Sequence, residues 1–316
     1  MDIAPWTAQE SDAFVEASPQ GTVFNKSFYL SSYGFPVRHL VCRKGNEEVA
    51  GFSFAEIPTG IKTLPYLVLN GVIFKDFKGV TQYRVNETVF QALEVFALYL
   101  FNRYQEISFS NHWDINDMRA FDWVNYHQRD KGYYQIFPQY TSLLNISNPE
   151  STDGYAHKRR IPELKKGIRE GRKFETKEIA DIELLNRLVD MNFQRQNIDR
   201  TQDERLALQR IVENLLKHRS AKLLATFMDG VLAVVTCFAF DRHRAYYLFV
   251  GTDENLRDWG VGTKNMYESC IILHRDLGLN ELDMVGVNSP LRGSYKLSFG
   301  GQLVPYFLIN KVLPKD

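Results

Sequence analysis

The chain has 316 residues, of which 44% are hydrophobic and 24% charged, a composition that excludes a disordered protein and leaves room for two domains of ordinary size. Its 38 basic residues balance its 38 acidic residues, which excludes a globally basic nucleic-acid binder but not a local basic patch. No apolar run reaches the roughly 18 residues that a membrane helix needs, so we expect a cytoplasmic protein without a membrane span.

The first half of the chain predicts a β-hairpin, a helix and two further strands. Residues 39–42 and 49–54 are apolar runs on either side of a short polar turn, as the strands of a hairpin are. Apolar residues recur at helical spacing from residue 87 to about residue 102, which predicts an amphipathic helix. A short strand is then expected at 106–110 and a closing strand at 135–140.

The second half repeats this order of elements. A hairpin is expected at 222–227 and 231–238, a helix from about 261 to 277, a short strand at 281–285 and a closing strand at 302–307. Both closing strands contain Gln-x-x-Pro. Strands and helices alternate by chance in many α/β chains, but four elements that match in order favour a duplication. We therefore predict an α+β fold of two tandem domains, each a mixed α/β sheet flanked by helices.

Residues 257–262 read Arg-Asp-Trp-Gly-Val-Gly and lie between a strongly β segment, 245–250, and the second predicted helix. Glycine lets the backbone approach a ligand closely, and the N–H groups of a first helical turn have no partner within the helix. Such a turn favours bound phosphate, and Arg257 can add a charge-assisted hydrogen bond. An ordinary tight turn is the alternative interpretation of the same spacing.

This turn resembles the acyl-CoA pyrophosphate loop of the GCN5-related N-acetyltransferases (GNAT), whose pattern is Gln/Arg-x-x-Gly-x-Gly/Ala. The wider chain resembles the FemABX branch of that superfamily, whose members carry two GNAT-like domains in tandem. The segments that carry the resemblance are 117–123, 138–141, 158–160, 163–171, 193–196 and 283–301. No long charged heptad segment is present, so the chain resembles the type without a helical arm.

The resemblance implies a division of labour between two domains. Residues 149–301 would form the C-terminal GNAT-like domain, which binds the acyl donor. Residues 1–148 would form the N-terminal GNAT-like domain on the acceptor side, which the strand 302–316 is able to join. In the family the acceptor lies in the cleft between the two lobes and is typically an amine-bearing cell-wall precursor or surface-polymer building block.

The donor in this family is either acyl-CoA or aminoacyl-tRNA. The intact turn favours acyl-CoA. Residues 156–173 hold eight Lys or Arg against two Glu, which favours tRNA unless the stretch is a solvated helix face with Ile161, Leu164 and Ile168 buried beneath it. The residues expected to bind the donor are Phe249, Val250, Arg257, Asp258, Trp259, Gly260, Val261, Gly262 and Thr263.

Transfer from a thioester to an amine needs no covalent enzyme intermediate and therefore no catalytic cysteine. It needs a neutral amine, a positioned carbonyl and donors for the oxyanion, which the resemblance implies are the backbone N–H groups near Phe249 and Val250. Asp283 is a candidate to accept a proton, Tyr295 to protonate the leaving thiolate and Lys296 to steady the oxyanion. Each has an alternative structural role, at a strand end, in aromatic packing or on the surface.

The candidate acceptor contacts combine aromatic, histidine and arginine side chains. They are His112, Trp113, His127, Tyr140, Arg159 and Arg160. A histidine beside aromatic residues is more often structural, and no histidine has the spacing of a metal site, so we expect no metal. The three cysteines lie in or beside apolar runs, and we expect buried free thiols.

Three functions remain open on the sequence. The first is an acetyl-CoA- or acyl-CoA-dependent N-acyltransferase that acts on a nucleotide-linked amino sugar for a surface polysaccharide. The second is an aminoacyl-tRNA-dependent transferase that acts on a peptidoglycan precursor. The third is a binding module on an inactive scaffold, which the intact turn argues against.

Overall fold

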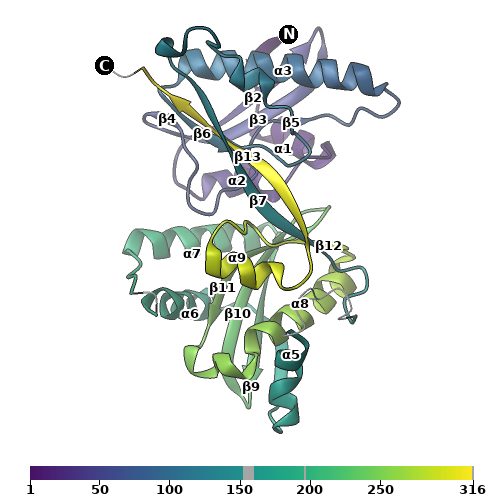
Figure 1. Ribbon diagram of the computed structural model, residues 1–316, viewed down its shortest axis with the longest axis vertical. Coiled ribbons are helices and arrows are strands. Elements are labelled where there is room, and N and C mark those ends of the chain that lie inside the picture. Colours follow the sequence, from purple (N-terminus) through teal and green to yellow (C-terminus); the bar gives the residue numbers. More distant parts are fainter. Residues whose placement is uncertain (152–159, 196, 315–316) are drawn as a thin grey trace. The chain divides into compact units, whose positions relative to one another are not determined.

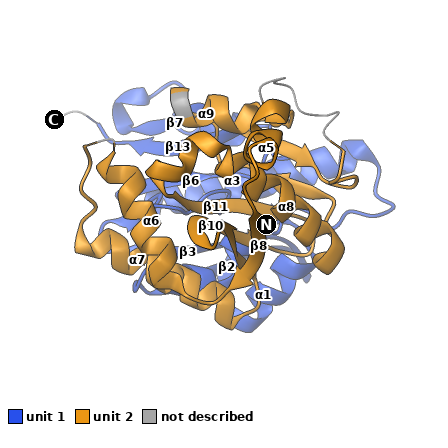
Figure 2. Cartoon of the chain, turned by 90° about the horizontal axis from the view of Figure 1, so that it is seen from below, with its two compact units in different colours: residues 1–139, 305–316 blue, residues 140–304 orange. Residues whose placement is uncertain are grey.

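The computed structural model describes residues 1–151, 160–195 and 197–314 and divides the chain into two compact units. Unit 1 comprises residues 1–139 and 305–316, and unit 2 comprises residues 140–304 (Figure 2). The sequence placed the divisions after residues 148 and 301. The difference arises because two long strands, β7 (Tyr133–Asn145) and β13 (Gln302–Val312), each contribute residues to both units.

Unit 1 contains a mixed sheet in the order β1-β2-β3-β4-β6-β13, with β5 paired to β3 (Figure 1). Its strands before β7 are β1 (Asp2–Pro5), β2 (Val37–Lys44), β3 (Glu47–Ile57), β4 (Gly60–Ile61), β5 (Ile73–Phe74) and β6 (Glu106–Ser110). Its helices are α1 (Ala8–Ala17), α2 (Ser27–Ser31), α3 (Gln82–Arg103) and α4 (Arg119–Asp122), with short 3-10 turns at Val23–Asn25 and Arg129–Lys131. The predicted hairpin is the antiparallel pair β2 and β3.

The long helix α3 packs against β1, β2 and β3 and buries its apolar stripe there. The fully buried side chains of this helix are Ala92, Leu93, Phe96, Ala97 and Leu100. Helix α3 begins five residues before the predicted start at residue 87, because polar residues can extend a helix beyond its apolar stripe. Sequence periodicity therefore identified the helix and its buried face but not its first turn.

Unit 2 contains a second mixed sheet in the order β7-β12-β11-β10-β9-β8. Its further strands are β8 (Phe174–Ile179), β9 (Ala221–Met228), β10 (Val231–Phe240), β11 (Ala245–Thr252) and β12 (Glu281–Asp283). Its helices are α5 (Arg160–Arg169), α6 (Ile182–Gln194), α7 (Gln202–Lys217), α8 (Val261–Leu277) and α9 (Pro290–Leu297), with the 3-10 turn η3 at Glu254–Trp259. The second predicted hairpin is β9 and β10, and α8 has the predicted bounds.

The strands that follow α8 differ from the prediction in length. Strand β12 ends at Asp283 rather than at residue 285, because Val285 adopts a left-handed conformation with φ 52°. Strand β13 pairs antiparallel with β6 in unit 1, through Leu308 to Asn310. Residues Leu143 to Asn145 of β7 pair antiparallel with β12 in unit 2. Each half of the sequence thus supplies the closing strand of the other half's sheet.

The cysteines behave as expected, since Cys42, Cys237 and Cys270 are buried free thiols. Burial raises the pKa of the Cys42 thiol to about 11 and that of Cys270 to about 12. Within the described ranges, no helix is both long enough and apolar enough to cross a membrane.

Candidate functional site

The turn that the sequence singled out joins η3 to α8. Gly260 has the left-handed conformation, with φ 73°, and α8 begins at Val261. The first intrahelical hydrogen bond runs from the Lys264 N–H to the Gly260 carbonyl, at 2.9 Å. The N–H groups of Val261, Gly262 and Thr263 make no hydrogen bond to any described residue. The start of α8 therefore has three donors for an anion, and the helix dipole favours negative charge there.

Helix α5 lies on this turn, which the sequence did not predict. A Cβ on Gly260 would lie 2.3 Å from the Glu163 carbonyl oxygen, so only glycine allows α5 to approach so closely. Lys166 Nζ donates to the Asp258 carbonyl at 2.7 Å. The Trp259 ring packs under Arg172, whose guanidinium lies 4.5 Å from the ring centroid. The basic stretch and the glycine turn thus form one cluster.

The buried face of α5 also differs from the expectation. Leu164 and Gly167 are buried, whereas Ile168 is 54% exposed. A Cβ on Gly167 would lie 2.4 Å from the Phe174 ring, so the helix packs through its glycine rather than through Ile168. The predicted stripe was wrong at this position, because close packing at Gly167 turns Ile168 toward solvent.

A charged network follows from this packing. Arg160 donates to Glu163 Oε2 at 2.5 Å and to Thr263 Oγ1 at 3.2 Å, and Thr263 Oγ1 donates to the same Glu163 oxygen at 2.9 Å. Arg160 Nε also donates to Ser298 Oγ at 2.6 Å, and its side chain is only 13% exposed. A carboxylate of the protein itself therefore lies at the first turn of α8, where a helix attracts negative charge.

Tyr295 of α9 also lies close to this turn. Its hydroxyl would be 3.2 Å from a Cβ on Gly262, and its ring packs against the Arg160 guanidinium, 4.5 Å from the ring centroid. Burial raises the pKa of Tyr295 to about 12, opposed by the nearby charges of Arg160 and Arg257. The phenol is therefore protonated at neutral pH and can donate a proton. Arg257 itself is exposed, and its guanidinium has no acceptor in the part of the chain that the structure describes.

The pairing of strand β11 with β12 ends before Phe249 and Val250. Its parallel pairing with β12 covers only Ala245 and Tyr246, while its pairing with β10 continues beyond Val250. The Val250 carbonyl accepts a hydrogen bond from Asn192 Nδ2 at 3.0 Å. Because β12 ends at Asp283, the edge of β11 beyond Tyr246 is not paired by β12, and the role of the N–H groups near Phe249 and Val250 stays a prediction.

Asp283 ends β12 next to this divergence and is 1% exposed. Its Oδ1 accepts from the Thr141 hydroxyl and from the Val285 N–H, the latter at 2.8 Å. No described residue hydrogen-bonds Oδ2. Burial raises the pKa of Asp283 to about 6, although the hydrogen bonds and the charges of Arg244 and Lys296 oppose the rise. The carboxyl group is thus mostly ionised at pH 7, with one free oxygen.

Lys296 of α9 lies beside this turn of the chain. Its ammonium donates to the carbonyls of Met284, Val285 and Gly286 at 2.5, 3.0 and 3.0 Å. Burial lowers the pKa of Lys296 to about 8, opposed by the negative charge of Asp283. All three N–H groups are therefore occupied, and the role of Lys296 at a reacting oxygen stays a prediction.

The residues expected to contact the acceptor are divided between the two units. The His112 side chain is 1% exposed; its Nδ1 accepts from the Asp114 N–H at 3.2 Å, and its ring stacks on Trp113 at 3.9 Å. His127 is exposed and contacts the ring of Tyr126. Tyr140 belongs to unit 2, where its N–H donates to Asn288 Oδ1 at 2.8 Å. Arg159 lies outside the described residues.

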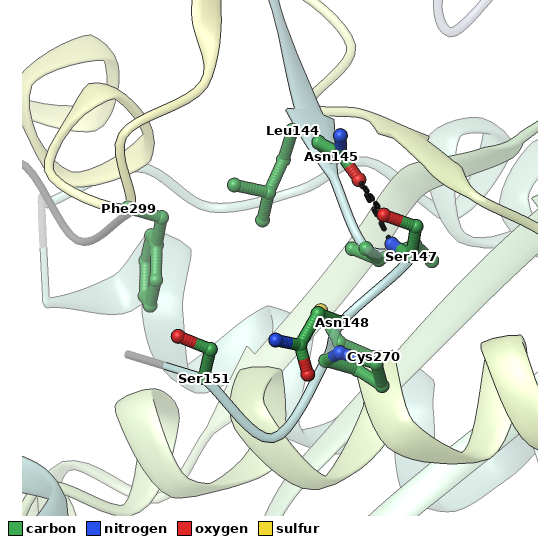
Figure 3. A pocket seen from close by; sticks show the side chains of 9 residues that line it. Leu144, Asn145, Ser147, Asn148, Ser151, Cys270 and Phe299 are labelled. Carbon is green, nitrogen blue, oxygen red and sulfur yellow. Dashed lines mark hydrogen bonds between the residues drawn. The ribbon is translucent and has the colours of Figure 1, made fainter. Parts of the chain in front are cut away.

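A cavity of about 250 Å³ lies in unit 2, next to the charged network around Arg160 (Figure 3). It is lined by Leu144, Asn145, Ile146, Ser147, Asn148, Pro149, Ser151, Cys270 and Phe299. Phe299 also packs against Arg160, 5.4 Å from its guanidinium. The side-chain oxygen of Asn145 accepts from the Ser147 hydroxyl and N–H, which fixes one wall. In the described ranges, no group of three His, Cys, Asp or Glu side chains is placed to hold a metal.

Comparisons with known proteins bear on the family and the fold. Residues 157–296 match the family model described as "Acetyltransferase (GNAT) domain". No curated protein matches the chain in sequence. Among solved structures, that of FemX has a TM-score of 0.67 at 13% identity and covers 97% of both chains. A tandem GNAT protein from the clavulanic acid biosynthesis pathway has a TM-score of 0.53 at 12% identity, covering 100% of this chain and 99% of that one. A conserved protein of unknown function from Bacteroides thetaiotaomicron has a TM-score of 0.58 at 10% identity and covers 99% of both chains. The predicted fold class is confirmed.

Proposed function

We propose that this chain, a GNAT acyltransferase with the FemABX-like tandem fold, moves an acyl group from acyl-CoA to an amine. The observation that carries the choice of donor is the start of α8, where three N–H groups lack acceptors in the described ranges and Arg257 lies exposed nearby. Backbone donors at a helix start suit a diphosphate. The proposed donor site is therefore the turn from Arg257 to Thr263, in unit 2.

The chemistry of aminolysis assigns a proposed role to two buried side chains. An amine resembling an α-amino group has a pKa of about 7.7–8.0, so part of it is neutral at cellular pH and can attack the thioester carbonyl. Asp283 Oδ2, which has no partner among the described residues, would take the proton that the attacking nitrogen loses. Tyr295, whose pKa is about 12, would give its proton to the departing thiolate. Backbone N–H groups near Phe249 and Val250 would face the oxyanion.

The acceptor is proposed from the family resemblance rather than from a pocket. Amines on nucleotide-linked amino sugars for surface polysaccharides are the proposed class. Arg160 would contact a phosphate group only by giving up a bond to Glu163, Thr263 or Ser298. The remaining acceptor candidates, His112, Trp113, His127, Tyr140 and Arg159, stay predictions.

One observation favours a second candidate, transfer from aminoacyl-tRNA. The Glu163 carboxylate lies at the first turn of α8 and would repel a diphosphate. Arg160 and Lys166 of α5, and Arg172 just beyond it, bring positive charge to the same turn. The fold is also similar to that of FemX. A donor that places no diphosphate on α8 would suit this arrangement.

Thermal unfolding with and without CoA or acetyl-CoA tests the choice of donor. A ligand present at 100 times its dissociation constant stabilises the folded state by about 2.7 kcal/mol. We expect a shift with both ligands, and a smaller shift in Arg257→Ala because one charge-assisted hydrogen bond to phosphate is lost.

Arg275→Ala is the matched control, since Arg275 is an exposed arginine near the other end of α8. It should retain the full shift. No shift in the wild type with either ligand, combined with retention of aminoacyl-tRNA on a filter, would replace the first candidate by the second.

A further inference from the structure

We propose that Lys296 is a positioning residue whose ammonium holds the turn 284–286 in a strained conformation and, through that turn, orients the Asp283 carboxylate. This role differs from direct contact with the reacting oxygen. Its catalytic consequence rests on the proposed function, but the structural part of the proposal is measurable without any substrate.

The ammonium group of Lys296 has no donor left for a substrate. A lysine carries three N–H groups and no acceptor. Three consecutive carbonyls, those of Met284, Val285 and Gly286, lie 2.5, 3.0 and 3.0 Å from Nζ. A hydrogen bond to a substrate oxygen would require one of these three to break.

The turn can present three successive carbonyls to one atom only because its backbone folds back sharply. In an extended strand, successive carbonyls point in alternating directions. Here Val285 has φ 52° and Gly286 has φ 76°, two left-handed residues in a row. A β-branched residue avoids this region because its Cβ crowds the backbone. The convergent bonds to Lys296 supply the interaction that keeps Val285 there.

The N–H side of the same turn orients the carboxylate. The Val285 N–H donates to Asp283 Oδ1 at 2.8 Å, and the Gly286 N–H donates to Thr141 Oγ1 at 3.2 Å. Because the Thr141 hydroxyl accepts from Gly286, its own proton points to Asp283 Oδ1. Both fixed donors therefore act on Oδ1, and Oδ2 is the oxygen left for a proton.

The next residues extend this arrangement to helix α9. The Val287 N–H donates to the Tyr140 carbonyl at 2.9 Å, and a Cβ on Gly293 would lie 2.3 Å from the Val287 carbonyl oxygen. Helix α9, which carries Lys296, thus packs directly on the end of the turn. The same helix carries Tyr295, so a shift of the turn would also move the proposed proton donor.

A rescue experiment separates positioning from direct contact. Lys296→Met removes the three hydrogen bonds, and we expect kcat to fall about 10²-fold because Asp283 is displaced. Adding Val285→Gly removes the backbone strain, since glycine adopts φ 52° freely. The double variant Lys296→Met/Val285→Gly should recover most of the lost kcat. If Lys296 touches the reacting oxygen, Val285→Gly restores nothing, and the proposal is overturned.

Two further variants control this test. Lys296→Arg keeps the charge, but a planar guanidinium cannot place three donors on three convergent carbonyls, so it should behave like Lys296→Met. Lys311→Met is the matched control in unit 1, where Lys311 Nζ donates to the carbonyls of Phe101 and Tyr104. It should lower stability without changing kcat.

Amide hydrogen exchange measures the stability of the turn 284–286 directly, in the protein without substrate. In Lys296→Met, the amides of Val285 and Gly286 should exchange faster than in the wild type, and Val285→Gly should restore much of the protection. Unchanged exchange in Lys296→Met would overturn the proposal even if activity were lost. If the wild type transferred no acyl group from acyl-CoA, the proposed function would fail while the exchange experiment still decided the role of Lys296.

Discussion

The two units begin the equivalent helix of the repeat in different ways. In unit 1, α3 follows Thr81 without a glycine, and its first turn exposes Tyr83 to 76%. In unit 2, α8 follows the left-handed Gly260, and its first N–H groups point to no acceptor among the described residues. Both helices pack on the sheet of their own unit. The first N–H groups of α3 are equally without a capping side chain, so the two starts differ in the left-handed Gly260 and the Arg-x-x-Gly-x-Gly pattern, which only α8 has among the described helices.

The strands that follow these helices differ in a similar way. In unit 1, the Ser108 hydroxyl of β6 hydrogen-bonds the Thr63 hydroxyl at 2.9 Å. In unit 2, the corresponding position of β12 is Asp283, which accepts from the Thr141 hydroxyl. A neutral hydroxyl pair and a hydroxyl–carboxylate pair thus stand at the same place in the repeat. Unit 2 alone carries a titratable group there, which costs stability but supplies a proton acceptor.

The largest expected effect comes from a methyl group at the start of α8. Gly260→Ala should destabilise the protein by about 3 kcal/mol, because a left-handed alanine costs about 1–2 kcal/mol and overlap with the Glu163 carbonyl adds a similar amount. The measurement is chemical denaturation. The variant should also weaken CoA binding, since α5 has to move.

Gly278→Ala at the other end of α8 is the matched control. Gly278 has φ 67°, close to that of Gly260, but a Cβ there would meet nothing within 4 Å. Its loss should be about 1–2 kcal/mol, from the backbone alone. Equal losses in the two variants would contradict the direct packing of α5 on the turn.

A smaller effect is expected from the pH dependence of Asp283. Burial raises its pKa from 3.8 to about 6, so between these values the unfolded chain loses the proton while the folded protein keeps it. The unfolding free energy of the wild type should therefore fall by about 2–3 kcal/mol between pH 4 and pH 7, relative to Asp283→Asn. Chemical denaturation of both proteins across this range measures the difference.

Ser108, the counterpart of Asp283 in unit 1, provides a control for this test. Ser108→Ala removes a neutral hydroxyl, so its effect on stability should be the same at every pH in this range. A constant difference between the wild type and Asp283→Asn would show that the carboxyl group does not titrate with a raised pKa.

Local patterns in the sequence predicted the hairpin, the long helix and the following strands of each unit, but not the other elements. Alternating and helical periodicity identified the two hairpins, the buried face of α3 and the bounds of α8, because these features depend on neighbouring residues. The glycine turn was also visible, because its spacing and its place before a helix are local properties. Each of these features could be predicted because it depends only on residues that are close together in the sequence.

The parts that the sequence did not reveal depend on contacts between distant residues. The family resemblance allowed the strand 302–316 to join the N-terminal domain, but periodicity shows neither its register with β6 nor the packing of α5 on Gly260 through Gly167 rather than through Ile168. The sequence also did not predict that three backbone carbonyls accept hydrogen bonds from Lys296, since nothing in the local pattern marks Val285 as left-handed. Such features follow from tertiary packing.

The smallest expected effect is on CoA affinity and comes from the Glu163 carboxylate, which lies at the start of α8. Glu163→Gln keeps an oxygen for the hydrogen bonds from Arg160 and Thr263 but removes the negative charge from the helix start. Charge at such a position is worth about 1 kcal/mol, so CoA should bind about fivefold more tightly, as titration calorimetry can measure. Glu170→Gln, an exposed glutamate just beyond α5, should leave the affinity unchanged. Weaker binding in Glu163→Gln would instead mean that the carboxylate helps the site, by holding Arg160 in place for the donor.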